Sequence, residues 1–252
     1  MLDAIIWGLT QGLTEFLPVS SSGHLVLVPA LLGRPSPDLA TAAFLHLGTL
    51  VAVLIYFRVE VGQMLRLTHD GRKMLKLVAV GTIPAAVIGL LFRGALGRFV
   101  ESPRAVAVSM LLLGMGLLST RFIATRERKV ADLRVPDAVA IGLAQAVALI
   151  PGVSRSGTTI AAAMMRGVDK AEAARFSFLL GIPAIAGAGL IETIDLTNTD
   201  AGITLTMAVG VLVAGVSGYL AIAGLLSLIR RTGLVPFGAY CIGFATLSLI
   251  VL

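Results

Sequence analysis

The sequence has little charge and almost no cysteine, and both shortages limit the class of protein. Only 13% of its 252 residues are charged, whereas soluble domains average about 25%. The single cysteine, Cys241, excludes an internal disulfide. Residues 1–11 contain Asp3 but no lysine or arginine, so no secretory signal peptide is expected there. An ordinary soluble or disulfide-stabilised secreted domain is therefore not expected.

What the sequence has is apolar length. It is 57% hydrophobic, with a mean hydropathy of +0.95, and several apolar runs reach the length of about 20 residues that spans a bilayer as a helix. The net charge of +6 lies mainly in short loops between these runs, which is typical of membrane topology and does not indicate a nucleic-acid partner. The pattern predicts an all-α polytopic membrane protein that contacts lipid.

Two further apolar segments are interrupted. We expect six full transmembrane helices, at about 40–57, 77–92, 105–121, 176–194, 203–226 and 236–252. Segments 4–31 and 138–165 are also apolar, but FLPVSSSGH breaks the first and IPGVSRSGTT the second. Proline and glycine end a helix, and serine or threonine can cap the next one. Because irregular backbone at membrane depth must be buried in protein or line a cavity, both segments are predicted to be re-entrant helical hairpins.

The two interrupted segments resemble each other at an offset of 134 residues. The pairs include Gly8 with Gly142, Gln11 with Gln145, Ser20 with Ser154, Ser22 with Ser156 and Gly23 with Gly157. Residues 79–91 likewise resemble residues 208–220 at an offset of 129. A chance match of small residues is the alternative, but the shared order of elements favours duplication. We predict one membrane domain over 1–252, with repeat 1 at about 1–122 and repeat 2 at about 136–252.

Three spans in each repeat would invert the second repeat relative to the first. Loops 58–76, 121–137, 166–175 and 228–235 hold 15 of the 20 lysines and arginines, which places them on the cytoplasmic side. Both termini then face outward, and the two hairpins enter from opposite faces so that their tips can meet. The loop with Arg93, Arg98 and Arg104 fits this topology least well.

Arg155 is the most unusual residue of the second hairpin. Ionisable residues inside a membrane usually serve a function, and an arginine offers five donors that suit phosphate oxygens. The half-helix that follows would add free backbone N–H groups at its N-terminus. The predicted phosphate-binding residues are Ser154, Arg155, Ser156, Gly157 and Thr159. The structural alternative is that Arg155 only neutralises Glu15.

The first hairpin carries candidate metal ligands and a candidate nucleophile. Gln11 and Glu15 share one helix face and could form part of a Mg²⁺ or Ca²⁺ site. Ser21 lies three residues before His24, so the histidine can activate the serine or attack phosphorus itself. The alternative is a serine cap beside a hydrogen-bonded histidine. His46 is predicted to be a packed or interfacial residue.

At this point a resemblance is evident. QGLTEFLPVSSSGH (11–24), FLHLGTLVAVLIYFR (44–58), PGVSRSGTT (151–159) and RFSFLLGIP (175–183) resemble the undecaprenyl-diphosphatase, or bacitracin-resistance, family of bacteria. The resemblance implies a hydrolase of the inner membrane. Such an enzyme converts undecaprenyl diphosphate to undecaprenyl phosphate and inorganic phosphate, and so recycles the lipid carrier of peptidoglycan synthesis. It also implies an inverted repeat, divalent-metal dependence and a site that opens toward the periplasm.

The resemblance also implies residue roles. Gln11 and Glu15 fall on the family's metal-binding motif, Ser21 and His24 on its catalytic serine and histidine, and Ser154, Arg155 and Thr159 on its phosphate site. Gln11 departs from members that have glutamate there, which implies weaker metal binding. Two rival functions remain: a polyprenyl-phosphate flippase with the same anion site, and a protein that only sequesters the diphosphate. The oligomeric state is left open, with a homodimer as one option.

Overall fold

The computed structural model describes residues 1–123, 127–197 and 205–252. These residues are almost entirely helical, and their only β-feature is an isolated bridge between Arg128 and Val168. The helices are α1 (Leu2–Phe16), α2 (Ser21–Leu31), α3 (Leu39–Tyr56), α4 (Arg58–Leu65), α5 (His69–Val100), α6 (Pro103–Ser119), α7 (Val135–Val147), α8 (Arg155–Met165), α9 (Lys170–Thr197), α10 (Leu205–Thr232) and α11 (Val235–Val251), with short 3₁₀ turns at Thr120–Phe122 and Val130–Asp132. The prediction of an all-α fold is confirmed.

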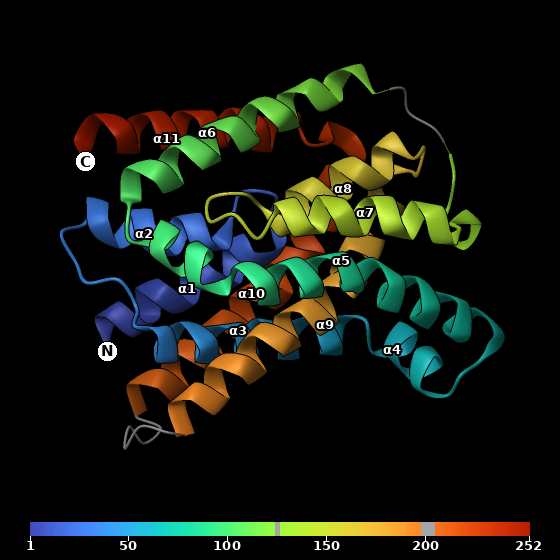
Figure 1. The fold of residues 1–252 in the computed structure, drawn as a ribbon, viewed down its shortest axis with the longest axis horizontal. Helices are drawn as coiled ribbons and strands as arrows, with labels where there is room; N and C mark the ends of the chain where they lie inside the picture. Colours follow the sequence, from blue (N-terminus) through green and yellow to red (C-terminus); the bar gives the residue numbers. More distant parts are fainter. Residues whose placement is uncertain (124–126, 198–204) are drawn as a thin grey trace.

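Every predicted span coincides with a helix, but the predicted ends differ. Helices α5 and α9 extend beyond the predicted spans 77–92 and 176–194, because charged end turns remain helical outside an apolar run. The first two residues of the predicted span 203–226 lie outside the described residues. Figure 1 shows the long helices running roughly along the long axis, with α6 and α11 on one side and α3 and α9 on the other.

Fewer helices meet a strict length and composition criterion for a membrane span than the six that the sequence predicts. Within the described residues, three stretches are long and apolar enough: His69–Phe92, Pro103–Phe122 and Leu205–Thr232. A fourth span is possible if Phe44–Tyr56 and Arg58–Leu65, which are bent by 83°, act together. Helix α11 is apolar but has only 17 residues. The structure therefore supports a membrane protein with several spans.

Both predicted breaks are present. Helix α1 ends at Phe16 and α2 begins at Ser21, where Ser20 Oγ accepts the N–H of Gly23 at 3.2 Å. Helix α7 ends at Val147 and α8 begins at Arg155, where Ser154 Oγ accepts the N–H of Gly157 at 3.0 Å. Each serine satisfies a backbone donor that a new helix would otherwise leave unpaired. The serine-rich motifs therefore start the second half-helix of each pair.

Close glycine contacts join the two parts of the chain. A Cβ on Gly8 would lie 2.6 Å from the carbonyl oxygen of Gly210, so α1 packs closely against α10. Likewise a Cβ on Gly142 would overlap the backbone of Gly81, where α7 packs against α5. Small residues permit this approach between membrane helices. The first half-helix of each pair thus packs on a long helix from the other part of the chain.

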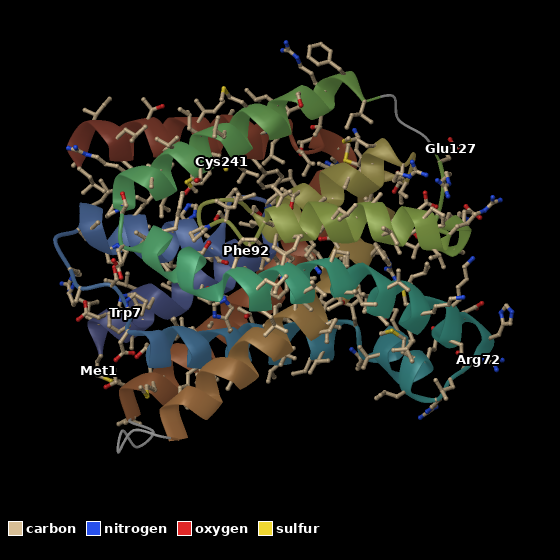
Figure 2. The ribbon with its side chains drawn as sticks, in the orientation of Figure 1. Met1, Trp7, Arg72, Phe92, Glu127 and Cys241 are labelled. Carbon is tan, nitrogen blue, oxygen red and sulfur yellow. The ribbon has the colours of Figure 1, made fainter. Side chains whose placement is uncertain are left out.

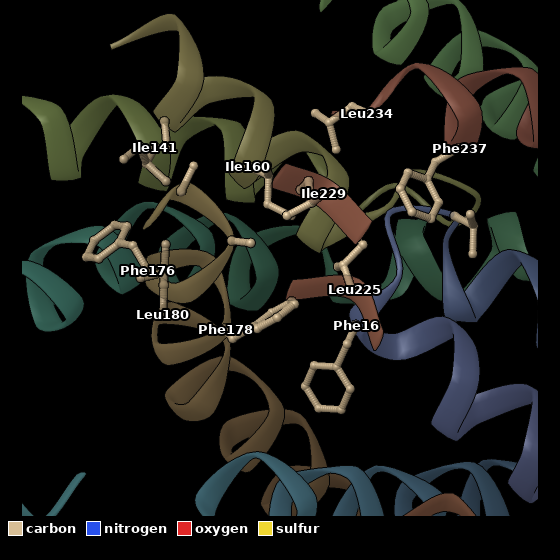
Figure 3. Packing of buried hydrophobic residues seen from close by; sticks show 14 of the residues in the cluster. Phe16, Ile141, Ile160, Phe176, Phe178, Leu180, Leu225, Ile229, Leu234 and Phe237 are labelled. Carbon is tan, nitrogen blue, oxygen red and sulfur yellow. The ribbon is translucent and has the colours of Figure 1, made fainter. Parts of the chain in front are cut away.

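The buried core fills the space between these helices. Phe16 at the end of α1 meets Phe178 of α9 edge to face, with ring centroids 5.4 Å apart. Figure 3 shows these two rings near Leu225 of α10, with Phe237 of α11 farther away in the same buried cluster. An edge-to-face pair adds about 1 kcal/mol beyond its apolar burial. This packing fixes the end of α1, directly before the first break.

An aspartate–arginine ion pair joins the start of the first half-helix to the end of the second in each interrupted segment. In the first, Asp3 Oδ1 lies 2.5 Å from Arg34 Nη1. In the second, Asp137 Oδ1 lies 2.7 Å from Arg166 Nε, and its Oδ2 lies 2.9 Å from Arg128 Nη2. Asp3 and Asp137 are 134 residues apart, so this ion pair is another feature that the two halves share.

We expect Asp137→Asn to destabilise the protein. Asp137 lies ahead of the membrane-entering segment 138–165. Burial raises the pKa of its carboxyl, but hydrogen bonds from Arg128, the Arg134 N–H and Arg166 outweigh this and lower the pKa from 3.8 to about 2. That shift corresponds to about 2 kcal/mol of unfolding free energy at pH 7.

The pH dependence identifies the carboxylate as the cause. Because the pKa is lowered by folding, the stabilisation is complete above pH 3.8 and is lost as the pH falls toward about 2. Thermal unfolding in detergent should therefore show a difference between wild type and Asp137→Asn that shrinks across this range. The matched variant Asp3→Asn should lose less, since the Asp3 side chain is 34% exposed. A pH-independent difference would argue against this explanation.

Candidate active site

The two breaks contact each other in the middle of the helical bundle. Ser156 Oγ donates to the carbonyl of Leu17 at 3.0 Å, and Gly152 N–H points to Ser22 Oγ at 3.5 Å. A Cβ on Gly23 would lie 3.3 Å from Gly152 Cα. The prediction that the two tips can meet is confirmed, and residues 129 to 139 positions apart in sequence lie together.

Glu15 is the centre of this site. Its Oε1 accepts from Arg155 Nη2 at 2.8 Å, and its Oε2 accepts from Ser21 Oγ at 2.6 Å and from Gln11 Nε2 at 3.0 Å. The residue is only 8% exposed. A buried carboxylate is tolerated when it is paired and hydrogen-bonded, and here all three partners are residues that the sequence singles out. The ion pair considered as a structural alternative is therefore present.

Arg155 reaches Glu15 across a neighbouring helix. It is the first residue of α8, and its Nη1 donates to the carbonyl of Ser177 on α9 at 3.3 Å. Its guanidinium lies against Gly181, where any Cβ would overlap it. The sequence drew attention to the motif at 175–183 but did not identify Ser177 and Gly181 as contacts of Arg155. A glycine one helical turn after a serine was the available signal.

The predicted phosphate-binding hydroxyls are engaged within the protein. Ser154 caps α8, Ser156 holds the first tip, and Thr159 Oγ1 lies 2.6 Å from Ser177 Oγ. These three residues are at most 2% exposed, and Gly157 lends its N–H to the cap. The arginine side chain is more accessible, at 15%. In this structure the hydroxyls build the support around Arg155, and Arg155 faces the site.

The structure brings Ser21 to Glu15 rather than to His24. His24 Nδ1 lies 2.8 Å from the carbonyl of Ser20, and His24 Nε2 lies 2.8 Å from the hydroxyl of Tyr240. The ring also stacks on Phe244 of α11, with centroids 4.7 Å apart. Both ring nitrogens are thus engaged, Nδ1 by the first tip and Nε2 by α11, while the Ser21 hydroxyl donates to Glu15. The base adjacent to the candidate nucleophile is a carboxylate.

His46 lies in the site, although the sequence favoured a packing role. Its Nδ1 lies 2.8 Å from the carbonyl of Ala42, which requires the proton on Nδ1. Its Nε2 lies 3.9 Å from Glu15 Oε2. The side chain is 24% exposed. Sequence reasoning missed it because a histidine on an apolar helix gives no sign of which neighbour it faces.

Gln11 offers an oxygen that suits a divalent cation. Its Oε1 is buried and has no hydrogen-bond partner within the described part of the chain. Gln145 Oε1, at the equivalent place in the second half, is in the same state, but Leu149 stands where Glu15 would be needed. No group of three or more His, Cys, Asp or Glu side chains among the described residues could hold a metal. An amide and a carboxylate oxygen fit Mg²⁺ or Ca²⁺, which complete their shells with water and phosphate oxygens.

Comparison with known proteins places this site in context. The family described as "Bacitracin resistance protein BacA" matches residues 4–247. A protein named "Undecaprenyl-diphosphatase" from Alcanivorax borkumensis is 44% identical over 248 residues, which covers 94% of this chain and 94% of that protein. One of the same name from Alteromonas mediterranea is 42% identical over 250 residues, or 95% and 94% of the two chains. One from Desulforudis audaxviator is 45% identical over 236 residues, or 91% and 89%.

Proposed function

The chain belongs to the family of the bacitracin resistance protein BacA, and from that premise we propose that it is an undecaprenyl-diphosphatase. It hydrolyses undecaprenyl diphosphate to undecaprenyl phosphate and inorganic phosphate, and so regenerates the lipid carrier of cell-wall synthesis. The observation that carries this assignment is the cluster in which Glu15 binds both Arg155 and Ser21. The cluster combines a phosphate-binding cation, a hydroxyl nucleophile and a base.

We propose the finer membrane architecture that the sequence predicts. Six spans and two re-entrant hairpins form a single domain of two inverted repeats, at about 1–122 and 136–252. The reciprocal packing supports this, since α1 packs on α10 as α7 packs on α5. The contacts Gly8–Gly210 and Gly142–Gly81 correspond to each other under the offsets of 134 and 129. An exchange of this kind is expected when two copies of one unit pair with each other.

The orientation follows from the charges. We propose that the protein lies in the bacterial inner membrane with both termini outside and the site opening to the periplasm. Figure 2 shows Arg72 and Glu127 at one end of the molecule and Met1 at the opposite end. The loops that contain Arg72 and Glu127, at 58–76 and 121–137, hold 10 of the 15 predicted cytoplasmic lysines and arginines.

In the proposed mechanism Arg155 binds the diphosphate oxygens through the guanidinium N–H groups that do not bind Glu15. The start of α8 is built by Ser154, Ser156, Gly157 and Thr159. The positive N-terminal end of this helix also attracts the diphosphate anion. When bound by Gln11 and Glu15, Mg²⁺ or Ca²⁺ supplies positive charge that offsets the negative charge of the phosphates. Positioning and charge stabilisation account for most of phosphoryl-transfer catalysis. The prenyl chain stays in lipid while the headgroup enters between the two tips.

Ser21 and Glu15 carry the bond changes. Ser21 Oγ attacks the terminal phosphorus, its proton passes to Glu15, and the bond to the bridging oxygen breaks with its electron pair on undecaprenyl phosphate. The departing lipid phosphate takes that proton, so Glu15 is again a carboxylate when water attacks the phosphoserine. Glu15 then accepts a proton from that water and returns it to Ser21 Oγ as inorganic phosphate leaves. Glu15 takes the role of base because it lies 2.6 Å from the hydroxyl.

We expect Ser21→Ala to lower kcat by at least about 1000-fold, because the nucleophile is lost. Release of phosphate from undecaprenyl diphosphate by purified protein in detergent is the measurement, since transport has no meaning without a membrane. Ser119→Ala, an exposed serine of α6, is the matched control. A phosphoserine trapped at position 21 would support the mechanism. A phosphohistidine trapped at position 24 would show that His24, and not Ser21, is the nucleophile.

The same measurement separates the rival functions. A wild-type protein that binds the lipid diphosphate without releasing phosphate would refute the enzyme. If such a protein moved polyprenyl phosphate across vesicles, and Ser21→Ala did so equally well, the flippase reading would be supported instead. Binding without either activity would identify a sequestering protein.

A further inference from the structure

The residue before the candidate nucleophile has an unusual backbone. Ser20 has φ +72° and ψ +98°, and Leu67 is the only other non-glycine residue with positive φ in the described part of the chain. Residues with a Cβ rarely adopt positive φ, and such strain persists only where the surroundings enforce it. The equivalent residue of the second tip, Ser154, has an ordinary φ of −76°. Of the two tips, only the one that presents Ser21 has a non-glycine residue at positive φ.

His24 holds the strained residue in place. The Ser20 carbonyl accepts from the backbone N–H of His24 at 3.1 Å and from His24 Nδ1 at 2.8 Å. Because a carbonyl only accepts, Nδ1 carries the proton, and in the neutral ring Nε2 is then an acceptor. The group that meets Nε2 is the Tyr240 hydroxyl, 2.8 Å away, which donates to it. The Ser20 carbonyl therefore fixes the tautomer, and the Tyr240 hydroxyl holds the ring in the orientation that binds Ser20.

Helix α11 anchors this connection. The His24 ring is 3% exposed and stacks on Phe244 at 4.7 Å and on Tyr240 at 5.7 Å, with interplanar angles of 7° and 4°. Rings that are stacked and hydrogen-bonded at both nitrogens have little freedom to turn. The contact runs from Tyr240 through His24 to Ser20, directly beside Ser21, whose hydroxyl binds Glu15.

We propose that Tyr240 is a positioning residue for the proposed phosphatase reaction. It acts through His24 to keep Ser20 at positive φ, and so keeps the Ser21 hydroxyl directed at Glu15. The family resemblance placed His24 beside the serine as a catalytic partner, whereas this geometry makes it the link between α11 and the strained turn. The proposal rests on the proposed function, because its effect is read through turnover.

Tyr240→Phe tests the proposal with the least disturbance. The variant keeps the stacked ring and removes only the hydroxyl. We expect kcat to fall about 10-fold while KM stays within twofold, because the nucleophile is misdirected but the phosphate site is intact. Tyr219→Phe, a tyrosine of α10 that packs on Tyr56, is the matched control and should keep wild-type kcat.

A second background distinguishes positioning from any other role of Tyr240. Glycine adopts positive φ without strain and is a tolerated helix N-cap, so Ser20→Gly should not need the support. We expect Tyr240→Phe to change kcat by less than twofold in the Ser20→Gly background. This coupling is the quantity that a double-mutant cycle measures.

Three results have different meanings. Wild-type kcat in Tyr240→Phe would overturn the proposal, and so would an equal loss in the serine and glycine backgrounds, because the hydroxyl would then act by another route. If wild-type protein released no phosphate, the proposed function would fail first, and that failure is visible without any Tyr240 variant.

Discussion

Arg155→Ala lowers kcat for undecaprenyl diphosphate by at least about 1000-fold, which is among the largest losses that we expect from a single substitution in this chain. The guanidinium is the one cation of the site that binds a carboxylate directly, with Nη2 2.8 Å from Glu15. In a site shielded from water, each fixed positive group that meets developing charge is worth several kcal/mol. Phosphate release in detergent, measured over a range of substrate concentrations, gives kcat and KM separately.

Two companion variants separate catalysis from folding. Removing one partner of a buried ion pair costs about 3–5 kcal/mol because the other charge is left unpaired, so Arg155→Ala should also lower the midpoint of thermal unfolding. Arg155→Ala combined with Glu15→Gln removes that unpaired charge and should recover much of the midpoint but none of the activity. Arg155→Lys keeps the charge without the planar fork and should recover only part of kcat. Near-wild-type kcat in a folded Arg155→Ala protein would contradict the assignment.

Sequence patterns located the two breaks because proline, glycine and capping serines act locally. Ser20 and Ser154 each cap a half-helix, and hydroxyl caps are recognisable from the residues on either side. Helix ends were less predictable. The charged segment from His69 to Lys76 belongs to α5, although hydropathy alone assigns it to a loop. Hydropathy reports where a helix is apolar, whereas hydrogen bonding decides where it ends.

The sequence also predicted which tips carry chemistry, but not how their side chains pair. Glu15 and Arg155 stood out because an ionisable residue in an apolar segment needs a reason. The partner of Ser21 could not be decided from spacing, since His24 is three residues away and Glu15 is six. The break at residues 17–20 turns the chain back, so the carboxylate of α1 comes to the start of α2. The geometry of this turn therefore determines that Glu15, and not His24, is the base next to Ser21.

Residues far along the chain were beyond sequence reasoning. Tyr240 meets His24 across 216 positions, and Ser177 meets Arg155 across 22. Each is an unremarkable residue of an apolar helix until tertiary packing gives it a partner. The duplication narrowed the search for the tips, because it related residues 11–24 to residues 145–158. It gave no sign of the hydrogen bond between Tyr240 of α11 and His24 of the first tip.

Glu15→Gln is expected to abolish turnover and also to lower the midpoint of thermal unfolding, because Arg155 loses its carboxylate partner. Glutamine has nearly the shape of glutamate, so its single amide oxygen can still accept from Arg155 while its NH₂ group can donate to Ser21 Oγ. It cannot take the proton of the Ser21 hydroxyl at neutral pH, and it loses the negative charge that attracts a divalent cation. We expect kcat to fall by at least about 1000-fold. Single-turnover experiments should show that the loss lies in formation of the phosphoserine.

The control is Glu15→Asp, which keeps the carboxylate but withdraws it by about 1.5 Å. A base that must reach Ser21 should tolerate this poorly but not completely, so kcat should fall about 10- to 100-fold and the metal requirement should remain. Wild-type phosphoserine formation in Glu15→Gln would show that the serine needs no carboxylate. His24 would then be the remaining candidate, and it would have to release Tyr240 in order to reach Ser21. Loss of activity in Glu15→Gln, together with slower but persistent phosphoserine formation in His24→Asn, assigns the proton transfer to Glu15.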